Sequence, residues 1–253
     1  MSALWAHVTQ MKLSKNERST DPAFSKFLLL VGSNVVPHSI PDPEWGPLQQ
    51  YTKYMPIPSS MVSSVKNLGA FIKEMFPDIN AYDHSRPVSI LTPKNVDKRL
   101  INDKCFAKFQ SRQYPSSISV DSARAMHSDI ELNIPPETLA NFNPSGMPPH
   151  ILKFKKSAPY VCLKNVNLPA GLCNGTRLEL LGKSRFFIHV KSVHNDKEHF
   201  IPRFMNIDND TFGLQLRRKQ FPVQLAYAMS INKAQVPIYF IFFYFYFFLS
   251  NVF

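Results

Sequence analysis

The sequence predicts an α/β fold with a small β-barrel or sandwich in its second half. Strand-like runs alternate with amphipathic helical runs up to residue 109, and from residue 151 apolar and polar side chains alternate with a period of two. The 253 residues allow one large domain or two small ones, with enough chain to bury a core without disulfides or metals. With 19% charged and 44% apolar residues, the composition excludes a generally disordered chain.

Helices and strands alternate in the predictions before residue 110. Asp21-Pro22 pairs an N-cap residue with proline at the first helical position, which marks the start of one helix. The predicted elements are a strand over Val8–Leu13, helices over Asp21–Leu30 and Ser63–Met75, a strand over Pro87–Leu91 and a helix over Asn95–Phe109. The last helix would turn four apolar side chains inward: Val96, Leu100, Ile101 and Phe106.

Short strands dominate the predictions for the second half. Residues 110–150 are less regular, with a short helix over Pro135–Phe142 and turn residues at Asn143–Gly146. A period of two places Lys153 and Lys155 on one strand face, as in a groove that follows a nucleic-acid backbone. Strands are predicted over 151–155, 160–163, 177–181, 185–193 and 199–202, followed by a strand-then-helix pattern over 221–231.

The positive charge of the chain is concentrated in one segment. Residues 151–235 hold 14 basic and 5 acidic residues, whereas residues 1–150 hold 15 and 13, and the whole chain carries +11. This excess predicts an anionic partner, nucleic acid first, with a solvated surface as the alternative. Within the segment, Arg217-Arg218-Lys219 precedes Phe221, so phosphates and a base could bind together there. The alternative for this patch is an exposed turn.

The last 18 residues contain 10 of the 32 aromatic residues. Their uninterrupted apolar run, Val236–Leu249, has 14 residues and includes Pro237. A membrane-spanning helix needs about 20, so we predict an aggregation-prone end and no specific membrane partner. The N-terminus lacks a signal-peptide pattern, and the three cysteines have no C-x-x-C spacing. We therefore expect reduced thiols in a cytosolic or nuclear protein.

Three further patterns could indicate catalytic or metal chemistry. Gly182-Lys183-Ser184 resembles the end of a phosphate-binding loop, but Arg177 occupies the position that needs glycine, so a hairpin turn is predicted. The histidines at 189, 194 and 199 are spaced by five, which fits surface or packing roles better than a metal site. Arg18 follows the first predicted strand, where an arginine can reach a phosphate; a surface ion pair is the alternative.

Several separate motifs in consistent order indicate a family. They are L-S-K-N-E-R-S (13–19), the helix at 21–32, I-L-T-P-K-N (90–95), N-P-S-G-M-P-P-H (143–150), G-L-C-N-G-T-R-L (171–178), I-P-R (201–203) and R-R-K-Q-F-P-V-Q-L-A-Y-A-M-S-I-N-K-A-Q (217–235). Together they resemble the C-terminal half of Pif-type DNA helicases, in the branch encoded by Helitron transposons. The resemblance covers about residues 8–235.

The resemblance implies an ATP-driven 5′-to-3′ DNA helicase with two RecA-like domains. The fold expected for this chain is an incomplete second RecA-like domain of the P-loop NTPase type, with an inserted small β-barrel. Residues 1–150 and 205–235 would belong to the RecA-like domain, residues 151–204 to the DNA-contacting barrel, and residues 236–253 to a non-homologous tail. The family also implies a nuclear or mitochondrial location and work in DNA repair, recombination and telomere maintenance.

Site residues follow from the matching motifs. Arg18 matches an arginine expected near the γ-phosphate of ATP, although Glu17 stands where methionine is usual. The block that begins at Ser230 matches one expected to contact the DNA backbone and couple it to ATP. The expected nucleic-acid-binding residues are Lys153, Lys155, Asn174, Arg177, Arg217, Arg218, Lys219, Ser230, Asn232, Lys233 and Gln235; no metal ligand is expected.

The sequence lacks several parts of such a helicase. The first RecA-like domain, with its P-loop and magnesium-binding acidic pair, is absent, so ATP and Mg²⁺ are implied for the full-length family but not expected to bind this chain alone. The expected partners are single-stranded DNA and that missing domain. Val236 stands where the family has glycine, which suggests a retained intron or a frameshift. The alternative function is a non-enzymatic single-strand-binding module or a transposon relic.

Overall fold

The computed structural model describes Ser25, Lys26, Leu29, Val65 and residues 67–126, 130–211 and 213–230, with the backbone alone for 209–211. The chain divides into two units, Met1–Ser59 and Ser60–Phe253. In the first unit Ser25, Lys26 and Leu29 are helical, as predicted for that stretch. The strand predicted over Val8–Leu13 lies outside the described residues.

The second unit is an α/β structure, which confirms the predicted class. Its helices are α2 (Leu68–Met75), the 3₁₀ turn η4 (Ile79–Ala81), α3 (Asn95–Lys108) and α4 (Pro136–Asn141). Its strands are β1 (Ile90–Thr92), β2 (Gln113–Ile118), β3 (Val120–Ala125), β4 (Glu131–Leu132), β5 (Ile151–Lys155), β6 (Pro159–Cys162), β7 (Arg177–Lys183), β8 (Phe187–Ser192), β9 (Glu198–Pro202), β10 (Phe204–Thr211), β11 (Leu214–Gln220), β12 (Val223–Leu225) and β13 (Ala228–Ser230). In the described part of the chain, no helix is long and apolar enough to span a bilayer.

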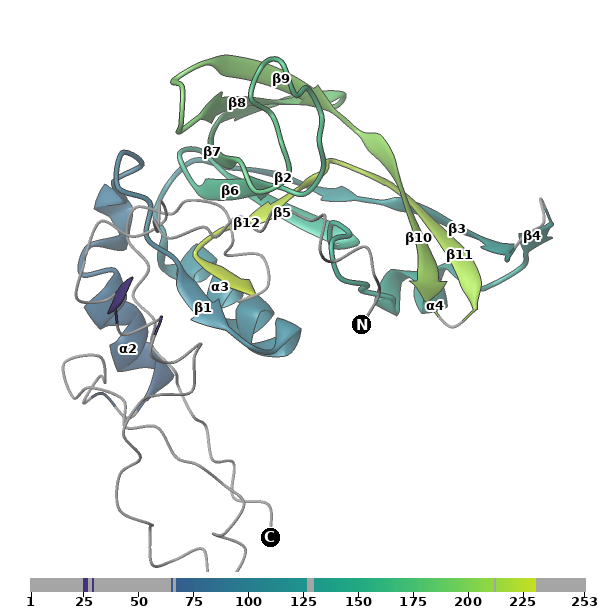
Figure 1. Ribbon diagram of the computed structural model, residues 1–253, viewed down its shortest axis with the longest axis horizontal. Coiled ribbons are helices and arrows are strands. Elements are labelled where there is room, and N and C mark those ends of the chain that lie inside the picture. The colour runs from purple at the N-terminus through teal and green to yellow at the C-terminus, as the bar shows by residue number, and fades with distance from the viewer. Residues whose placement is uncertain are drawn as a thin grey trace, which may run out of the picture. The chain divides into compact units, whose positions relative to one another are not determined.

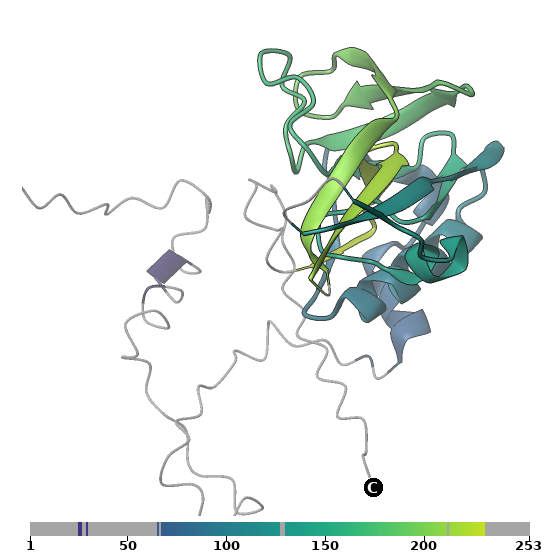
Figure 2. The same cartoon turned by 90° about the vertical axis from the view of Figure 1, so that its right-hand side faces the viewer.

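Four sheets organise these strands (Figure 1). β1 and β13 pair in parallel, and α3 packs beside them. β2 pairs with β5, and β12-β6-β7-β8-β9 form an antiparallel sheet of five strands. β10-β11-β3-β4 form a second antiparallel sheet, in which β10 and β11 make a long hairpin (Figure 2). Because β12 pairs with β6, residues beyond the predicted barrel boundary at 204 belong to the five-stranded sheet.

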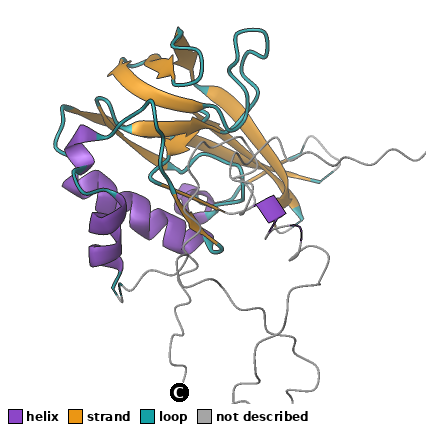
Figure 3. Ribbon diagram, turned by 60° about the vertical axis from the view of Figure 1, so that its left-hand side comes forward, coloured by secondary structure: helices purple, strands orange, loops and turns teal. Residues whose placement is uncertain are grey.

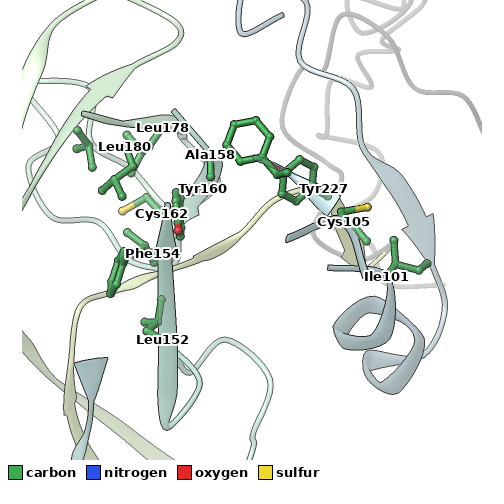
Figure 4. Close-up of a cluster of buried hydrophobic side chains, with 14 of the residues drawn as sticks. Ile101, Cys105, Leu152, Phe154, Ala158, Tyr160, Cys162, Leu178, Leu180 and Tyr227 are labelled. Carbon is green, nitrogen blue, oxygen red and sulfur yellow. The ribbon is translucent and has the colours of Figure 1, made fainter. Parts of the chain in front are cut away.

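The main core joins helices α2 and α3 to the five-stranded sheet (Figures 3 and 4). Tyr227, in the short link between β12 and β13, is fully buried at its centre. Its ring lies 5.7 Å from that of Phe76 and 5.8 Å from that of Tyr82. Burial of such rings contributes both hydrophobic free energy and edge-to-face contacts. The link between β12 and β13 is therefore fixed from several sides, which positions β13.

Local residues explain where helix α2 begins. It starts at Leu68 rather than at the predicted Ser63, because Asn67 is its N-cap and the Asn67 Oδ1 accepts from the backbone N–H of Ala70 at 2.8 Å. Within α2, Ile72 is buried, and Leu68 packs partly buried against the core.

Helix α3 has the predicted extent but buries a different face. Val96 and Leu100 are 64% and 47% exposed, so the prediction that they face inward was wrong. Asn102 and Cys105 are buried instead, beside the correctly predicted Ile101 and Phe106. On β13, helix α3 meets the buried backbone N–H and C=O of Ala228, which need hydrogen-bond partners. An amide therefore replaces an apolar residue at the centre of the helix face.

Residues 110–150 contain more regular structure than the sequence predicted. β2 and β3 were missed because their patterns are not apolar and polar in alternation. Pro115 sits in β2 at a shift of register between Tyr114 and Ser117. In β3 the inward position Asp121 is charged, because it meets a buried arginine on β11. The predicted helix α4 and the turn at Ser145–Gly146 are both present.

The strands predicted after residue 150 are present as β5 to β9. A hairpin connects β7 and β8 as predicted, but Gly182 and Lys183 are still paired in β7 and the turn begins at Ser184. The pattern over 221–231 gives strand β12, but Ala228–Ser230 is a strand where a helix was predicted. The three cysteines are free thiols, and burial raises the pKa of Cys105 to about 12. Cys105 is therefore a packing residue rather than a nucleophile.

Candidate nucleic-acid interface

The carboxyl ends of the two parallel strands meet at Thr92 and Ser230, which are register partners in β1 and β13. Thr92 is buried, and its Oγ1 donates to the backbone oxygen of Lys94 at 3.0 Å. Ser230 is half-buried. Loops that contact ligands leave parallel sheets at this edge. The predicted residue Ser230 therefore lies where such a contact would form.

Asn102 fixes helix α3 to strand β13. Its Nδ2 donates to the backbone oxygen of Ala228, and the backbone N–H of Ala228 donates to its Oδ1, both at 3.0 Å. This arrangement holds the preceding turn of α3 beside β12, where the Nζ of Lys98 lies 3.4 Å from the Oε1 of Gln224. Arg99, the next residue, is exposed. Two cations thus lie on a rigid part of the fold.

A pocket of about 500 Å³ opens beside this part of α3. Lys98 and Arg99 line one side, Lys153 of β5 lines another, and the segment Asn143–His150 forms a wall. Asp103 pairs with Lys153 at 2.9 Å, which leaves an excess of positive charge. Amide groups complete the lining, from Asn95, Asn141 and Asn143. Cations and amide donors in a concave site suit a phosphate group.

Arg218 of β11 holds the pocket wall in place. It is fully buried, and its Nε and Nη2 donate to the two carboxylate oxygens of Asp121 at 2.9 and 2.8 Å. Its remaining donors reach the backbone oxygens of Pro148, in the wall, and Leu139, in α4, at 3.2 and 2.9 Å. One side chain therefore connects β11, β3, α4 and the wall.

Ser119, Asp121 and His150 form a cluster next to this arginine, but it is not a hydrolytic triad. The Nδ1 of His150 lies 2.7 Å from the Oγ of Ser119 and 3.2 Å from the Oδ2 of Asp121. A triad histidine uses its two nitrogens separately for these partners. Burial by itself would raise the pKa of Asp121. Hydrogen bonds from Arg218, Ser119 and His150, together with the charge of Arg218, outweigh this effect, so the pKa lies below its ordinary value. The carboxylate is thus ionised and structural.

Residues 137–182 match the family model for the 2B domain of the DNA helicase Pif1. The predicted resemblance to Pif-type helicases is confirmed by this match. The matched segment runs from α4 through the pocket wall to β7, and it includes Lys153. No curated protein matches the chain.

Solved structures of Pif1 helicases are similar to the chain at low identity. Bacteroides Pif1 bound to single-stranded DNA is 16% identical, with 87% of this chain and 42% of that chain covered and a TM-score of 0.47. Pif1 from Candida albicans is 19% identical, with 66% and 45% covered and a TM-score of 0.41. Unliganded Pif1 from Bacteroides sp. is 18% identical, with 61% and 44% covered and a TM-score of 0.40. The chain spans less than half the length of these Pif1 chains.

The two lysines predicted within the 2B-matching segment lie in different environments. Lys153 is half-exposed and lines the pocket. Lys155 is buried, and its Nζ donates to the backbone oxygens of Phe106 and Phe109, both at 2.6 Å. Both side chains reach α3, since Lys153 pairs with Asp103 of that helix, so they share a face as predicted. The prediction that Lys155 contacts nucleic acid was wrong, because its ammonium is enclosed at the end of α3. Lys155 stabilises the end of that helix.

The basic patch Arg217-Arg218-Lys219 is divided between two faces of β11. Arg218 points inward, as described above, so the prediction that it contacts nucleic acid was wrong. Arg217 is half-buried and Lys219 exposed on the opposite face, where their register partners on β10 are Ile207 and Met205. The alternation within one strand separates these side chains. Only Arg217 and Lys219 remain available on the surface.

Asn174 lies in the loop before β7, and Arg177 is the first residue of β7. Asn174 is exposed, and its backbone N–H donates to the Oδ1 of Asn165 at 2.9 Å. The Nη1 of Arg177 donates to the backbone oxygen of Ala226 at 3.0 Å, which connects β7 to the link before β13. Neither residue lines the pocket. Arg18, Asn232, Lys233 and Gln235 lie outside the described residues.

Sequence reasoning missed Lys98 and Arg99 as site residues. Both lie on a helix that was predicted, but their spacing alone resembles any solvated helix face. Only the packing of Asn102 against β13 shows which side of α3 meets the wall at 143–150. Among the described residues, no group of three or more His, Cys, Asp or Glu side chains could hold a metal ion.

Proposed function

We propose that this chain is part of an ATP-dependent 5′-to-3′ DNA helicase of the Pif type, in the Helitron branch. It would supply the second RecA-like domain and an inserted small barrel, and its role would be to bind single-stranded DNA and to line part of the ATP site. The match of residues 137–182 to the Pif1 2B domain carries this proposal. The net charge of residues 151–235 supports it. The product would work in the nucleus or the mitochondrion.

The pocket beside α3 is the proposed contact for the DNA backbone. Lys98, Arg99 and Lys153 would neutralise phosphates there, and the amides of the lining would add hydrogen bonds. Such contacts read charge and shape rather than base sequence. Ser230 and the residues that follow it in the sequence would extend the contact along the edge of β1 and β13.

We assign ATP and Mg²⁺ chiefly to the first RecA-like domain of such a helicase. In the part of the chain that the structure describes, no group of three or more His, Cys, Asp or Glu side chains could hold a magnesium ion. Arg18 remains the proposed contact to the γ-phosphate. When bound, Mg²⁺ would neutralise developing charge on the phosphates during transfer.

Salt dependence of binding tests the proposed contact. Fluorescence anisotropy with a labelled oligothymidylate, repeated between low and moderate salt, gives the slope of log K against log salt. Each phosphate neutralised on a single strand contributes about −0.7 to this slope. Replacement of Lys98 and Arg99 by alanine should therefore weaken binding and make the slope shallower by about 1.4.

The matched control is Lys108→Ala, an exposed lysine in the last turn of α3 that does not line the pocket. Its salt slope should equal that of the unchanged chain. A wild-type slope in the Lys98→Ala, Arg99→Ala variant would show that DNA does not use this pocket. Absence of DNA binding at low salt would contradict the proposed function as a whole.

A second candidate function is a non-enzymatic single-strand-binding module or a transposon relic. The regional charge favours it, because binding by charge requires no nucleotide. The nucleotide sequence of the transcript distinguishes the two proposals. An open reading frame that continues upstream into a P-loop supports the helicase, whereas stop codons there support the relic.

A further inference from the structure

Strands β8 and β9 expose an unusual amount of aromatic surface. Phe186, Phe187 and Phe200 are 73%, 39% and 63% exposed. Aromatic side chains usually bury most of their area, and neighbouring exposed ones mark a binding surface. These residues lie beyond the segment that matches the Pif1 2B domain, and Figures 1 and 2 place β8 and β9 away from α3.

The strand register places the rings of Phe187, His189 and Phe200 together on one face, and Phe186 precedes them in the turn before β8. Phe187 lies opposite Pro202 and His189 opposite Phe200, on the outward face of the β8–β9 pair. The His189 ring stacks on that of Phe200 with centroids 4.5 Å apart and planes at 17°, and the Phe187 ring meets Phe200 edge-on at 5.2 Å. We call Phe186, Phe187, His189 and Phe200 the aromatic row.

The aromatic row is not required by the core. The alternate positions of the same strands, Ile188, Val190 and Ile201, are fully buried and fill the inner face of the sheet. The outward rings therefore contribute little to folding, and their exposure costs hydrophobic free energy. Exposure of this kind is explained when another molecule covers the rings.

The charges around the aromatic row favour an anionic occupant. The guanidinium of Arg185 lies 5.6 Å from the centre of the Phe186 ring, at the end of the row. The carboxylate of Glu198 is engaged by His189 at 2.7 Å, and that of Asp196 by Lys191 at 2.8 Å. Exposed rings beside a cation suit a single strand, since its bases stack while its phosphates pair with charge.

We propose that the aromatic row is a stacking platform for the unpaired bases of single-stranded nucleic acid, with Arg185 beside it as a phosphate contact. This inference rests on the proposed function and adds a base-contacting surface separate from the pocket. Phe186 and Phe200, the most exposed rings, are the principal stacking residues. Because every base has a π-face, the platform accepts any sequence.

An abasic strand separates stacking from charge. Anisotropy is measured for the full chain with a labelled oligothymidylate and with an abasic strand of equal length, which carries the same phosphates without bases. Phe200→Ala should weaken binding of the oligothymidylate roughly 5- to 150-fold, the range for loss of one stacked base. Phe186→Ala should act in the same direction. Binding of the abasic strand should be unchanged in both variants.

Two controls keep the result specific. Leu168→Ala removes another exposed apolar side chain, outside the row, and should leave both affinities unchanged. Phe200→Trp should preserve binding of the oligothymidylate. The platform is refuted if Phe186→Ala and Phe200→Ala bind both strands like the unchanged chain, although salt-dependent binding to the abasic strand would still support the pocket. Self-association in sedimentation that these two substitutions abolish would also refute it, because the row would then bind a second copy.

Discussion

Arg218 shows how one side chain can change role between sequence and structure. In the sequence it belongs to a basic run, but in the fold its guanidinium donates hydrogen bonds to Asp121, Pro148 and Leu139. We predict that Arg218→Met lowers the free energy of unfolding by about 3–5 kcal/mol, because the carboxylate of Asp121 would stay buried without its cation. Urea unfolding followed by circular dichroism measures this loss.

Lys219→Met is the matched control on the same strand. Lys219 is exposed on the other face of β11, so its replacement should change the free energy of unfolding by no more than about 0.5 kcal/mol. Equal losses in the two variants would contradict the structural role of Arg218. The basic patch divides in this way because neighbouring residues of a strand face opposite sides.

At the scale of elements, the contact between α3 and β13 depends on a polar residue. Asn102→Leu should destabilise the fold, because the N–H and C=O of Ala228 would both lose their partner in a buried position. Each unsatisfied group costs about 1–3 kcal/mol. Thermal unfolding measures the loss, and DNA binding at the pocket should weaken because Lys98 and Arg99 lose their fixed position.

Asn95→Leu makes the same chemical change at an exposed position of the same helix. It should leave the melting temperature close to that of the unchanged chain. If Asn102→Leu is equally harmless, an apolar contact can replace the amide, and the orientation of α3 has another cause.

Patterns in the sequence predicted the elements whose cores are apolar and failed where buried groups are polar. Strands β7 and β8 alternate buried aliphatic residues with outward residues, so a period of two located them. Strand β3 has Asp121 at an inward position, and its partner Arg218 lies 97 residues further along the chain. No local pattern reports such a pair. The same reason explains why Asn102 was overlooked on α3.

The candidate site was predictable only in part for a related reason. The segment 143–150 and Lys153 were found because motifs and strand period identify them, and both line the pocket. Lys155 looked equivalent to Lys153, but its ammonium is used by backbone oxygens at the end of α3. Segments that are distant in sequence decide whether a cationic side chain is exposed to solvent or bonded within the protein. Counts of charged residues alone therefore cannot predict which cations are available for binding.

At the scale of the whole molecule, binding and catalysis should separate. The chain holds a basic pocket and an aromatic row, but its sequence contains no P-loop pattern. Transfer of a phosphoryl group needs the P-loop backbone, its lysine and the magnesium ligands together. We therefore predict that the purified chain binds single-stranded DNA yet releases no phosphate from ATP above background, in the presence of Mg²⁺ and oligothymidylate.

A colorimetric phosphate assay measures this, on the same preparation whose DNA binding has been verified by anisotropy. That pairing matters because a misfolded sample would also fail to hydrolyse ATP, but it would not bind DNA in a manner sensitive to Lys98→Ala and Arg99→Ala. Hydrolysis stimulated by DNA would mean that nucleotide chemistry resides in this chain after all. It would then overturn the assignment of ATP to the first RecA-like domain, while the pocket and the aromatic row would remain as separate, testable surfaces.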